Sequence, residues 1–98
     1  MKFILNFTKS AEEQLKNLKR DKGLKERKKA VDKALKFLQT NPRHPGLRTH
    51  KYETLKGPGD EPVFESYAGQ NTPAAYRIFF YYGYSKGEIT IIAITPHP

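Results

Sequence analysis

The chain contains no cysteine and no run of about 18 apolar residues, the length that crosses a membrane as a helix. Without cysteine, neither a disulfide framework nor a thiolate metal site can form. The three histidines are scattered and lack carboxylates at ligand spacing, so we expect no metal and no cofactor. The apolar stretch in residues 1–7 is too short for a signal peptide. These absences predict a cytoplasmic protein with no membrane partner.

Basic residues are scarce in the second half of the chain, where only Arg77 and Lys86 follow Lys56. The net charge is +8, but residues 1–56 hold 16 Lys and Arg against 6 Asp and Glu, whereas the remainder holds 2 against 4. A cationic surface of this kind suits nucleic acid, an anionic membrane surface or an acidic protein. The alternative is that lysine-rich helix faces only keep the protein in solution.

The first half of the chain predicts one strand and two helices. Alternating apolar residues indicate a strand over residues 2–7. Ser10 and Glu13 have the spacing of a capping box, which predicts the start of a helix, and Gly23 predicts its end. A second helix, apolar on one face and basic on the other, is predicted to end before Pro42. Its apolar stripe holds Leu24, Val31, Ala34, Leu35, Phe37 and Leu38, and its basic face holds Lys25, Lys29, Lys33 and Lys36.

The second half predicts strands over residues 63–67, 75–82 and 88–95, with a further extended segment at 49–55. Glycine and proline turns separate them, including one at residues 69–73. Such short connections imply an antiparallel meander of three or four strands. Helices packed on one face of this sheet give an α+β fold. The third of these strands is apolar on both sides, which predicts a central position.

Strand alternation divides the aromatic strand at 75–82 into two faces. Ile78 and Phe80 share one side, and we expect the helices to cover it together with Phe64. The opposite face is then a polar and aromatic concavity. Its predicted members are Glu65, Tyr67, Arg77 and Tyr81.

Arg77 is a permanent charge inside an aromatic strand. Because a guanidinium keeps its proton in proteins, it must pair with a carboxylate, stack on a ring or bind an anion such as phosphate. Glu65 on the neighbouring strand is the candidate carboxylate. The residues alone leave these three alternatives open.

The open face and the adjacent loop hold the residue types that RNA cleavage without metal requires. A ribose 2′-hydroxyl must lose a proton, the pentavalent phosphate must be stabilised, and the leaving 5′-oxygen must be protonated. Arg77 is the candidate phosphate clamp, His97 the acid, and Glu65 or His50 the base. Residues predicted to hold the RNA backbone or stack on bases are Arg43, Arg48, Lys51, Lys56, Tyr67 and Tyr81.

Each of these assignments has a structural alternative. Glu65 alone could neutralise Arg77, and His97 could lie in a frayed terminal segment. Most of the aromatic rings serve as packing residues, and single loop histidines are more often structural than catalytic.

Four segments together resemble the RelE/ParE superfamily of toxins from bacterial and archaeal toxin–antitoxin systems. They are Asn41-Pro42-Arg43-His44-Pro45-Gly46-Leu47, Leu55-Lys56-Gly57, Ala75-Tyr76-Arg77-Ile78-Phe79 and Ile94-Thr95-Pro96-His97-Pro98. The resemblance implies a single compact α+β domain over residues 1–98. It implies that Arg77 occupies the position of the family's phosphate-binding arginine, and that His97 is similar to the C-terminal general acid of the YoeB-like branch. Where RelE itself carries strand lysines, this chain has Glu65 and Tyr67.

The resemblance also implies a function. RelE-like members are endoribonucleases that cut mRNA on the ribosome and so inhibit translation, and an antitoxin protein silences them. ParE-like members instead poison DNA gyrase, and a third alternative is a binding module that kept the fold without the chemistry. The expected partners are therefore an antitoxin, mRNA and the ribosome, with gyrase only under the second alternative.

Overall fold

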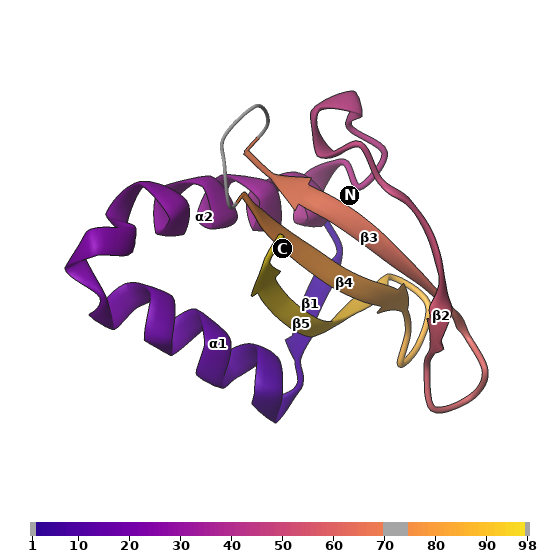
Figure 1. The fold of residues 1–98 in the computed structure, drawn as a ribbon. Helices are drawn as coiled ribbons and strands as arrows, with labels where there is room; N and C mark the ends of the chain where they lie inside the picture. The colour runs from indigo at the N-terminus through magenta and orange to yellow at the C-terminus, as the bar shows by residue number, and fades with distance from the viewer. Residues whose placement is uncertain (1, 70–74, 98) are drawn as a thin grey trace.

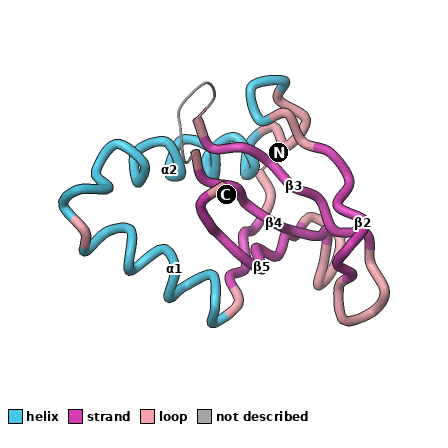
Figure 2. Tube along the Cα trace, in the orientation of Figure 1, coloured by secondary structure: helices cyan, strands magenta, loops and turns pink. Residues whose placement is uncertain are grey.

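The computed structural model describes residues 2–69 and 75–97, so most of the predicted turn at 69–73 and the terminal Pro98 lie outside the described residues. The elements follow the predicted order, and the class is α+β (Figures 1 and 2). They are β1 (Ile4–Phe7), α1 (Lys9–Arg20), the 3-10 turn η1 (Lys22–Leu24), α2 (Lys25–Thr40), the 3-10 turn η2 (Pro45–Leu47), β2 (His50–Lys56), β3 (Pro62–Ala68), β4 (Tyr76–Tyr82) and β5 (Glu88–Pro96).

A single five-stranded sheet has the order β1-β5-β4-β3-β2. Strands β2 to β5 form the predicted antiparallel meander, and β1 pairs in parallel with β5. The helical hairpin lies on one side of the sheet, with α1 against β5 and α2 against β3 and β4 (Figure 1). Strand β5 therefore occupies the interior of the sheet, which confirms the prediction from its two apolar sides. Within the described ranges, neither helix is both long and apolar enough to cross a membrane.

The main core lies between the helices and the sheet. Val31, Leu38 and Phe80 are fully buried there, and Ile78 and Ile91 join them from the sheet. Burying one such side chain contributes about 1.5–3 kcal/mol. The predicted parity of β4 is confirmed, and so is the predicted stripe except for Leu24, which lies in η1 before α2 begins. The four lysines of the opposite α2 face are exposed.

Helix α1 starts earlier than the capping-box pattern predicts. Its N-cap is Thr8, whose hydroxyl accepts a hydrogen bond from the Ala11 amide at 3.2 Å and donates one to the Ile92 carbonyl at 3.2 Å. Ser10 lies inside the helix, so the prediction for it was wrong. Thr8 is the N-cap because its own backbone is extended, as an N-cap requires, and its hydroxyl also bonds strand β5. The helix also ends before Gly23, at the Asp21 C-cap.

A second, smaller core covers part of the other sheet face. Val63, Phe79 and Tyr81 are buried there, and Tyr52 of β2 meets the Phe79 ring edge-on at a centroid distance of 4.9 Å. Tyr81 is 2% exposed, so its ring cannot stack on a base. The prediction of Tyr81 as an RNA contact was therefore wrong, because Tyr81 is packed into this second core.

The β1–β5 edge contains a carboxylate with a shifted pKa. The hydroxyl of Ser85 and the amide of Asn6 both donate to Glu88, the second at 2.8 Å, and these bonds lower the pKa of Glu88 against a smaller opposing effect of burial. Because the folded protein holds this proton less tightly than the unfolded chain, the bonds stabilise the fold above the ordinary glutamate pKa. That stabilisation is lost as the pH falls through the lowered value.

We therefore expect the urea midpoint of the wild-type chain to fall between about pH 5 and about pH 3 by more than that of Glu88→Gln, which cannot titrate at this position. Unfolding followed by circular dichroism at a series of pH values measures the difference. Parallel pH curves for the two proteins would show that Glu88 does not contribute. Exposed Glu12→Gln on α1 is the matched control.

Candidate active site

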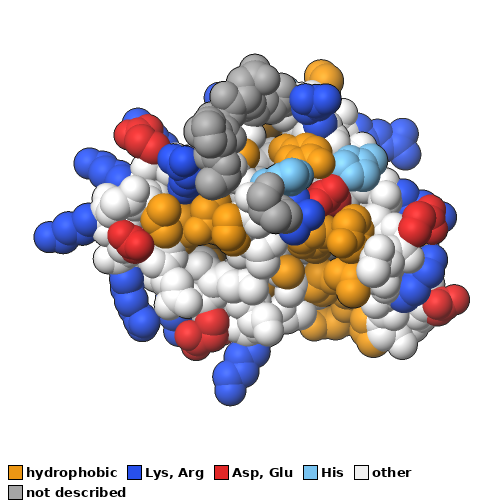
Figure 3. Space-filling model, viewed as in Figure 1, with side chains coloured by type: hydrophobic (Ala, Val, Ile, Leu, Met, Phe, Trp, Pro, Cys, Tyr) orange, Lys and Arg blue, Asp and Glu red, His pale blue; other side chains and the backbone are white. Residues whose placement is uncertain are grey.

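Strand register brings the predicted site residues to one face of the sheet. His50 pairs with Glu65 across β2 and β3, and Tyr67 pairs with Arg77 across β3 and β4. Paired residues on adjacent strands point to the same side, so these four side chains share the face opposite the helices. Figure 3 shows histidine side chains next to an acidic and a basic side chain on this face. The two-residue periodicity that predicted the grouping of Glu65, Tyr67 and Arg77 is thus confirmed.

Glu65 lies at the centre of this group. It is 3% exposed, and its Oε2 accepts a hydrogen bond from Arg77 Nη1 at 2.9 Å while its Oε1 lies 2.6 Å from His50 Nε2. The Tyr67 hydroxyl approaches Oε1 more loosely, at 3.5 Å. A buried carboxylate requires such partners, because the desolvation of an unpaired charge costs several kcal/mol. Glu65 therefore holds His50 and Arg77 side by side and is itself shielded from a ligand.

Arg77 combines two of the three alternatives left open by the sequence. Its guanidinium pairs with Glu65 and also lies over the Phe79 ring, 4.9 Å from the centroid. Its Nε is buried and has no hydrogen-bond partner among the described residues. About a fifth of the side chain, 19%, remains exposed. An anion arriving from solvent can reach only this exposed part of the side chain.

His50 carries hydrogen bonds on both ring nitrogens. Nε2 faces Glu65, and Nδ1 lies 3.2 Å from the carbonyl oxygen of Arg48. Both ring nitrogens therefore have a partner in the fold, Nε2 a carboxylate and Nδ1 a backbone carbonyl. The His50 side chain is 49% exposed. This pair can therefore exchange a proton with a bound molecule.

The Tyr67 ring lies near two imidazoles. Its centroid is 5.8 Å from that of His50 and 6.0 Å from that of His97. The backbone amide of His97 donates to the Ala75 carbonyl at 2.8 Å, which fixes the residue after β5 against the start of β4. His97 is therefore not frayed, and it is exposed. The structure brings both candidate proton-transfer residues within reach of one surface that also contains Arg77.

The predicted RNA-backbone residues do not form one continuous group with this surface. Lys51 pairs in register with Phe64 and so points to the side opposite Glu65, and Lys56 pairs with Pro62 near the other end of β2. Arg43 and Lys51 instead line a groove of about 500 Å³. We call this the loop groove; it is lined by Pro42, Arg43, His44, Pro45, Arg48, Thr49, His50, Lys51, Phe64 and Tyr82.

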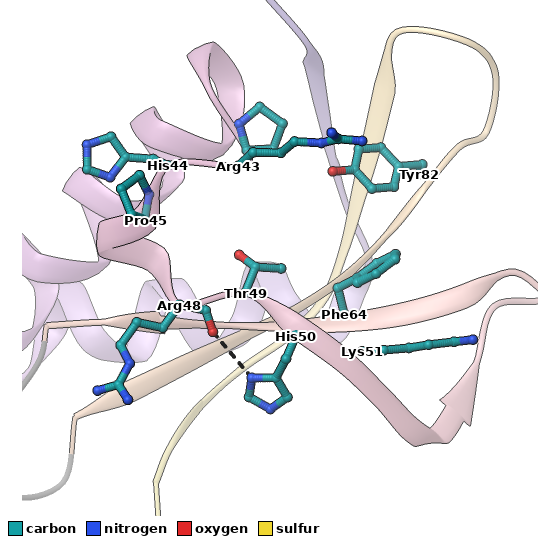
Figure 4. A pocket seen from close by; sticks show the side chains of 10 residues that line it. Arg43, His44, Pro45, Arg48, Thr49, His50, Lys51, Phe64 and Tyr82 are labelled. Atoms are coloured by element: carbon teal, nitrogen blue, oxygen red, sulfur yellow. Dashed lines mark hydrogen bonds between the residues drawn. The ribbon is translucent and has the colours of Figure 1, made fainter.

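Figure 4 shows the arrangement in the loop groove. Arg43 extends toward Tyr82, whereas Arg48 and His50 point away from it on the other side. Burial raises the pKa of Tyr82, and the positive charge of Arg43 opposes this shift. Sequence reasoning missed Tyr82 and Phe64 as site residues. Strand parity gave their face correctly, but the sequence did not indicate that the helices leave this end of the sheet uncovered.

No group of three or more histidine and acidic side chains in the described part of the chain is arranged to hold a metal ion. Glu65 and His50 have the donor atoms for one, but Arg77 occupies the position next to them.

Comparisons with known proteins identify the fold. No family model matches the sequence, and no curated protein matches it. A YoeB/ParE toxin from Agrobacterium tumefaciens superimposes with a TM-score of 0.68 at 14% identity, over 97% of this chain and 99% of that one. A chain of the archaeal RelE–RelB complex from Pyrococcus horikoshii superimposes with a TM-score of 0.65 at 18% identity, over 98% and 96%. The chain therefore has the fold of the RelE/ParE toxins over nearly its whole length.

Proposed function

We propose that this protein is the toxin of a toxin–antitoxin pair and that it cleaves mRNA bound to the ribosome. The observation that carries the proposal is that the Tyr67 ring has both His50 and His97 at centroid distances of 5.8 and 6.0 Å and pairs in register with Arg77. These residues supply two proton-transfer groups and a phosphate-binding cation on one accessible surface. The shared fold supports the choice of toxin class.

The proposed reaction forms a 2′,3′-cyclic phosphate. The 2′-oxygen attacks the adjacent phosphorus as its proton passes to a base, the bond from phosphorus to the 5′-oxygen breaks, and that oxygen takes a proton from His97. Arg77 stabilises the charge on the pentavalent phosphate. The reaction thus consists of two proton transfers and the exchange of the bond from phosphorus to the 5′-oxygen for one to the 2′-oxygen.

His50 is the better candidate for the base of the two that the sequence left open. Its imidazole is half exposed, whereas the Glu65 carboxylate is enclosed by its partners. Glu65 then orients the His50 ring through Nε2. To take the 2′-hydroxyl proton, Nδ1 must exchange its 3.2 Å contact with the Arg48 carbonyl for that hydroxyl.

Around this centre, Arg48, Lys51, Arg43 and Lys56 are proposed to hold the RNA backbone, and Tyr67 to contact a base. The antitoxin is proposed by analogy with the RelE–RelB complex, in which RelE is bound to a second protein. An acidic antitoxin suits the basic surface of residues 1–56.

The second candidate is a toxin that inhibits DNA gyrase, since one of the superimposed proteins is named a YoeB/ParE toxin. For that activity the exposed lysine face of α2 would be the contact surface rather than the imidazole pair.

A reconstituted translation system separates the two candidates. We expect the purified protein to cut mRNA only when ribosomes are present and to leave gyrase supercoiling unaffected. Primer extension locates the cuts. Intact mRNA together with inhibited gyrase would exclude the nuclease and support the second candidate.

A further inference from the structure

We propose that the loop groove is a second nucleotide subsite for the same RNA strand, adjoining the proposed active site at His50. This proposal rests on the proposed function for its choice of RNA. It concerns where a neighbouring nucleotide of the strand is held, beyond the scissile phosphate.

The charges of the loop groove suit a phosphate. Arg43, Arg48 and Lys51 are exposed there, and none of the described residues that line the groove is acidic. Lys51 forms an exposed pair with Glu53, whose carboxylate lies 4.0 Å from Lys51 Nζ, and exposed pairs of this kind contribute little. The Glu65 carboxylate contacts His50 from the opposite sheet face. The side chains that line the groove therefore carry an excess of positive charge.

The aromatic residues of the groove suit a base. The Tyr82 side chain is 41% exposed, and the Phe64 ring supports it edge-on at a centroid distance of 5.7 Å. Arg43 extends to this ring (Figure 4), so a cation and an aromatic face lie together. Single-stranded nucleic acid is bound by this combination of stacked bases and basic side chains. The volume of about 500 Å³ is enough for one nucleotide.

The groove adjoins the proposed active site through β2. His50 lines the groove and also bonds Glu65 on the open face, while the next residue, Lys51, points to the opposite side. A strand whose scissile phosphate lies at Arg77 can therefore pass over the start of β2 and place a neighbouring nucleotide between Arg43 and Tyr82. An acidic peptide would find the same charges, but the exposed aromatic face beside a guanidinium favours a base.

Length dependence of RNA binding tests this placement. Fluorescence anisotropy is measured with a labelled trinucleotide and a labelled octanucleotide, both 2′-O-methylated so that they cannot be cleaved. For Arg43→Gln/Lys51→Gln, we expect the affinity ratio of octanucleotide to trinucleotide to fall about tenfold. The slope of log K against log salt concentration for the octanucleotide should fall by about 1.4, which corresponds to about 0.7 for each lost phosphate contact.

The matched control is Lys16→Gln/Lys19→Gln, which removes the same charge from exposed positions on α1. Equal ratios in the two double variants would overturn the proposal, since they would show a general charge effect. A second outcome would overturn the proposal in favour of an acidic protein partner. In it, Arg43→Gln/Lys51→Gln loses binding of a hexaglutamate peptide but keeps the wild-type affinity ratio of octanucleotide to trinucleotide. Binding as expected without cleavage of unmodified mRNA would leave the subsite intact and refute only the nuclease.

Discussion

Replacing His97 with glutamine is expected to slow mRNA cleavage by about 10²–10⁴-fold, the usual contribution of a positioned acid or base. The imidazole is exposed beside Tyr67, and the hydrogen bond from residue 97 to the Ala75 carbonyl is donated by the backbone amide. His97→Gln should therefore fold normally. Single-turnover cleavage of ribosome-bound mRNA measures the rate. The effect should fall on kcat rather than on KM, because the proton is transferred in the transition state.

The control for His97→Gln is another histidine. His44 stacks on Phe37 and its Nδ1 accepts a hydrogen bond from the Gly46 amide at 2.9 Å, so His44→Asn keeps an acceptor for that bond and lies outside the proposed acid–base pair. Because His44 lines the loop groove, an effect of His44→Asn should fall on KM, and kcat should stay within about threefold of wild type. If His97→Gln also cleaves at the wild-type rate, the assignment of His97 as the acid fails.

Removing Arg77 is expected to affect stability as well as activity. Arg77→Ala leaves Glu65 buried with His50 as its remaining charged partner, and we expect the free energy of unfolding to fall by about 3 kcal/mol. Glu65→Gln should cost less, because a neutral amide carries a smaller desolvation penalty. In the double variant the two losses should not add, with a coupling of about 1–3 kcal/mol. Urea unfolding of the wild type, the two single variants and the double variant measures this double-mutant cycle.

This coupling decides how the function of Arg77 can be tested. An inactive Arg77→Ala protein would be ambiguous, because the loss of activity and the loss of folded protein occur together. Arg77→Lys keeps a positive charge for Glu65 and loses the planar fork that binds phosphate. We expect it to fold and to cleave poorly. Additive losses in the stability cycle would contradict the pairing, and full activity of Arg77→Lys would contradict the phosphate clamp.

The sequence predicted the arrangement of the strands well, because strand faces depend on a local repeat. Alternation in β3 and β4 placed Glu65, Tyr67 and Arg77 on one side, and the apolar sequence of β5 placed that strand inside the sheet. The same alternation could not predict that Tyr81 is buried. Its burial comes from a second core that also includes Tyr52 of the edge strand, and that packing depends on how the edge strand lies against its neighbours.

Features that depend on loops were the least predictable. Ser10 and Glu13 matched a capping box, but Thr8 competed better because it also bonds the Ile92 carbonyl, a partner distant in the sequence. The loop groove was missed for a related reason. Its residues come from the segment after α2 and from three strands, and only the folded chain shows that Arg43 reaches Tyr82.

The position of β5 in the sheet has a consequence for folding during synthesis of the chain. Strand β1 pairs only with β5 among the described strands, and Asn6 and Thr90, which are hydrogen-bonded, lie 84 residues apart. A chain still attached to the ribosome that makes it therefore lacks the strand that joins β1 to β4 until residues 88–96 emerge. His97 follows directly. Under the proposed function, a partly synthesised chain is thus inert toward the translation machinery that is producing it.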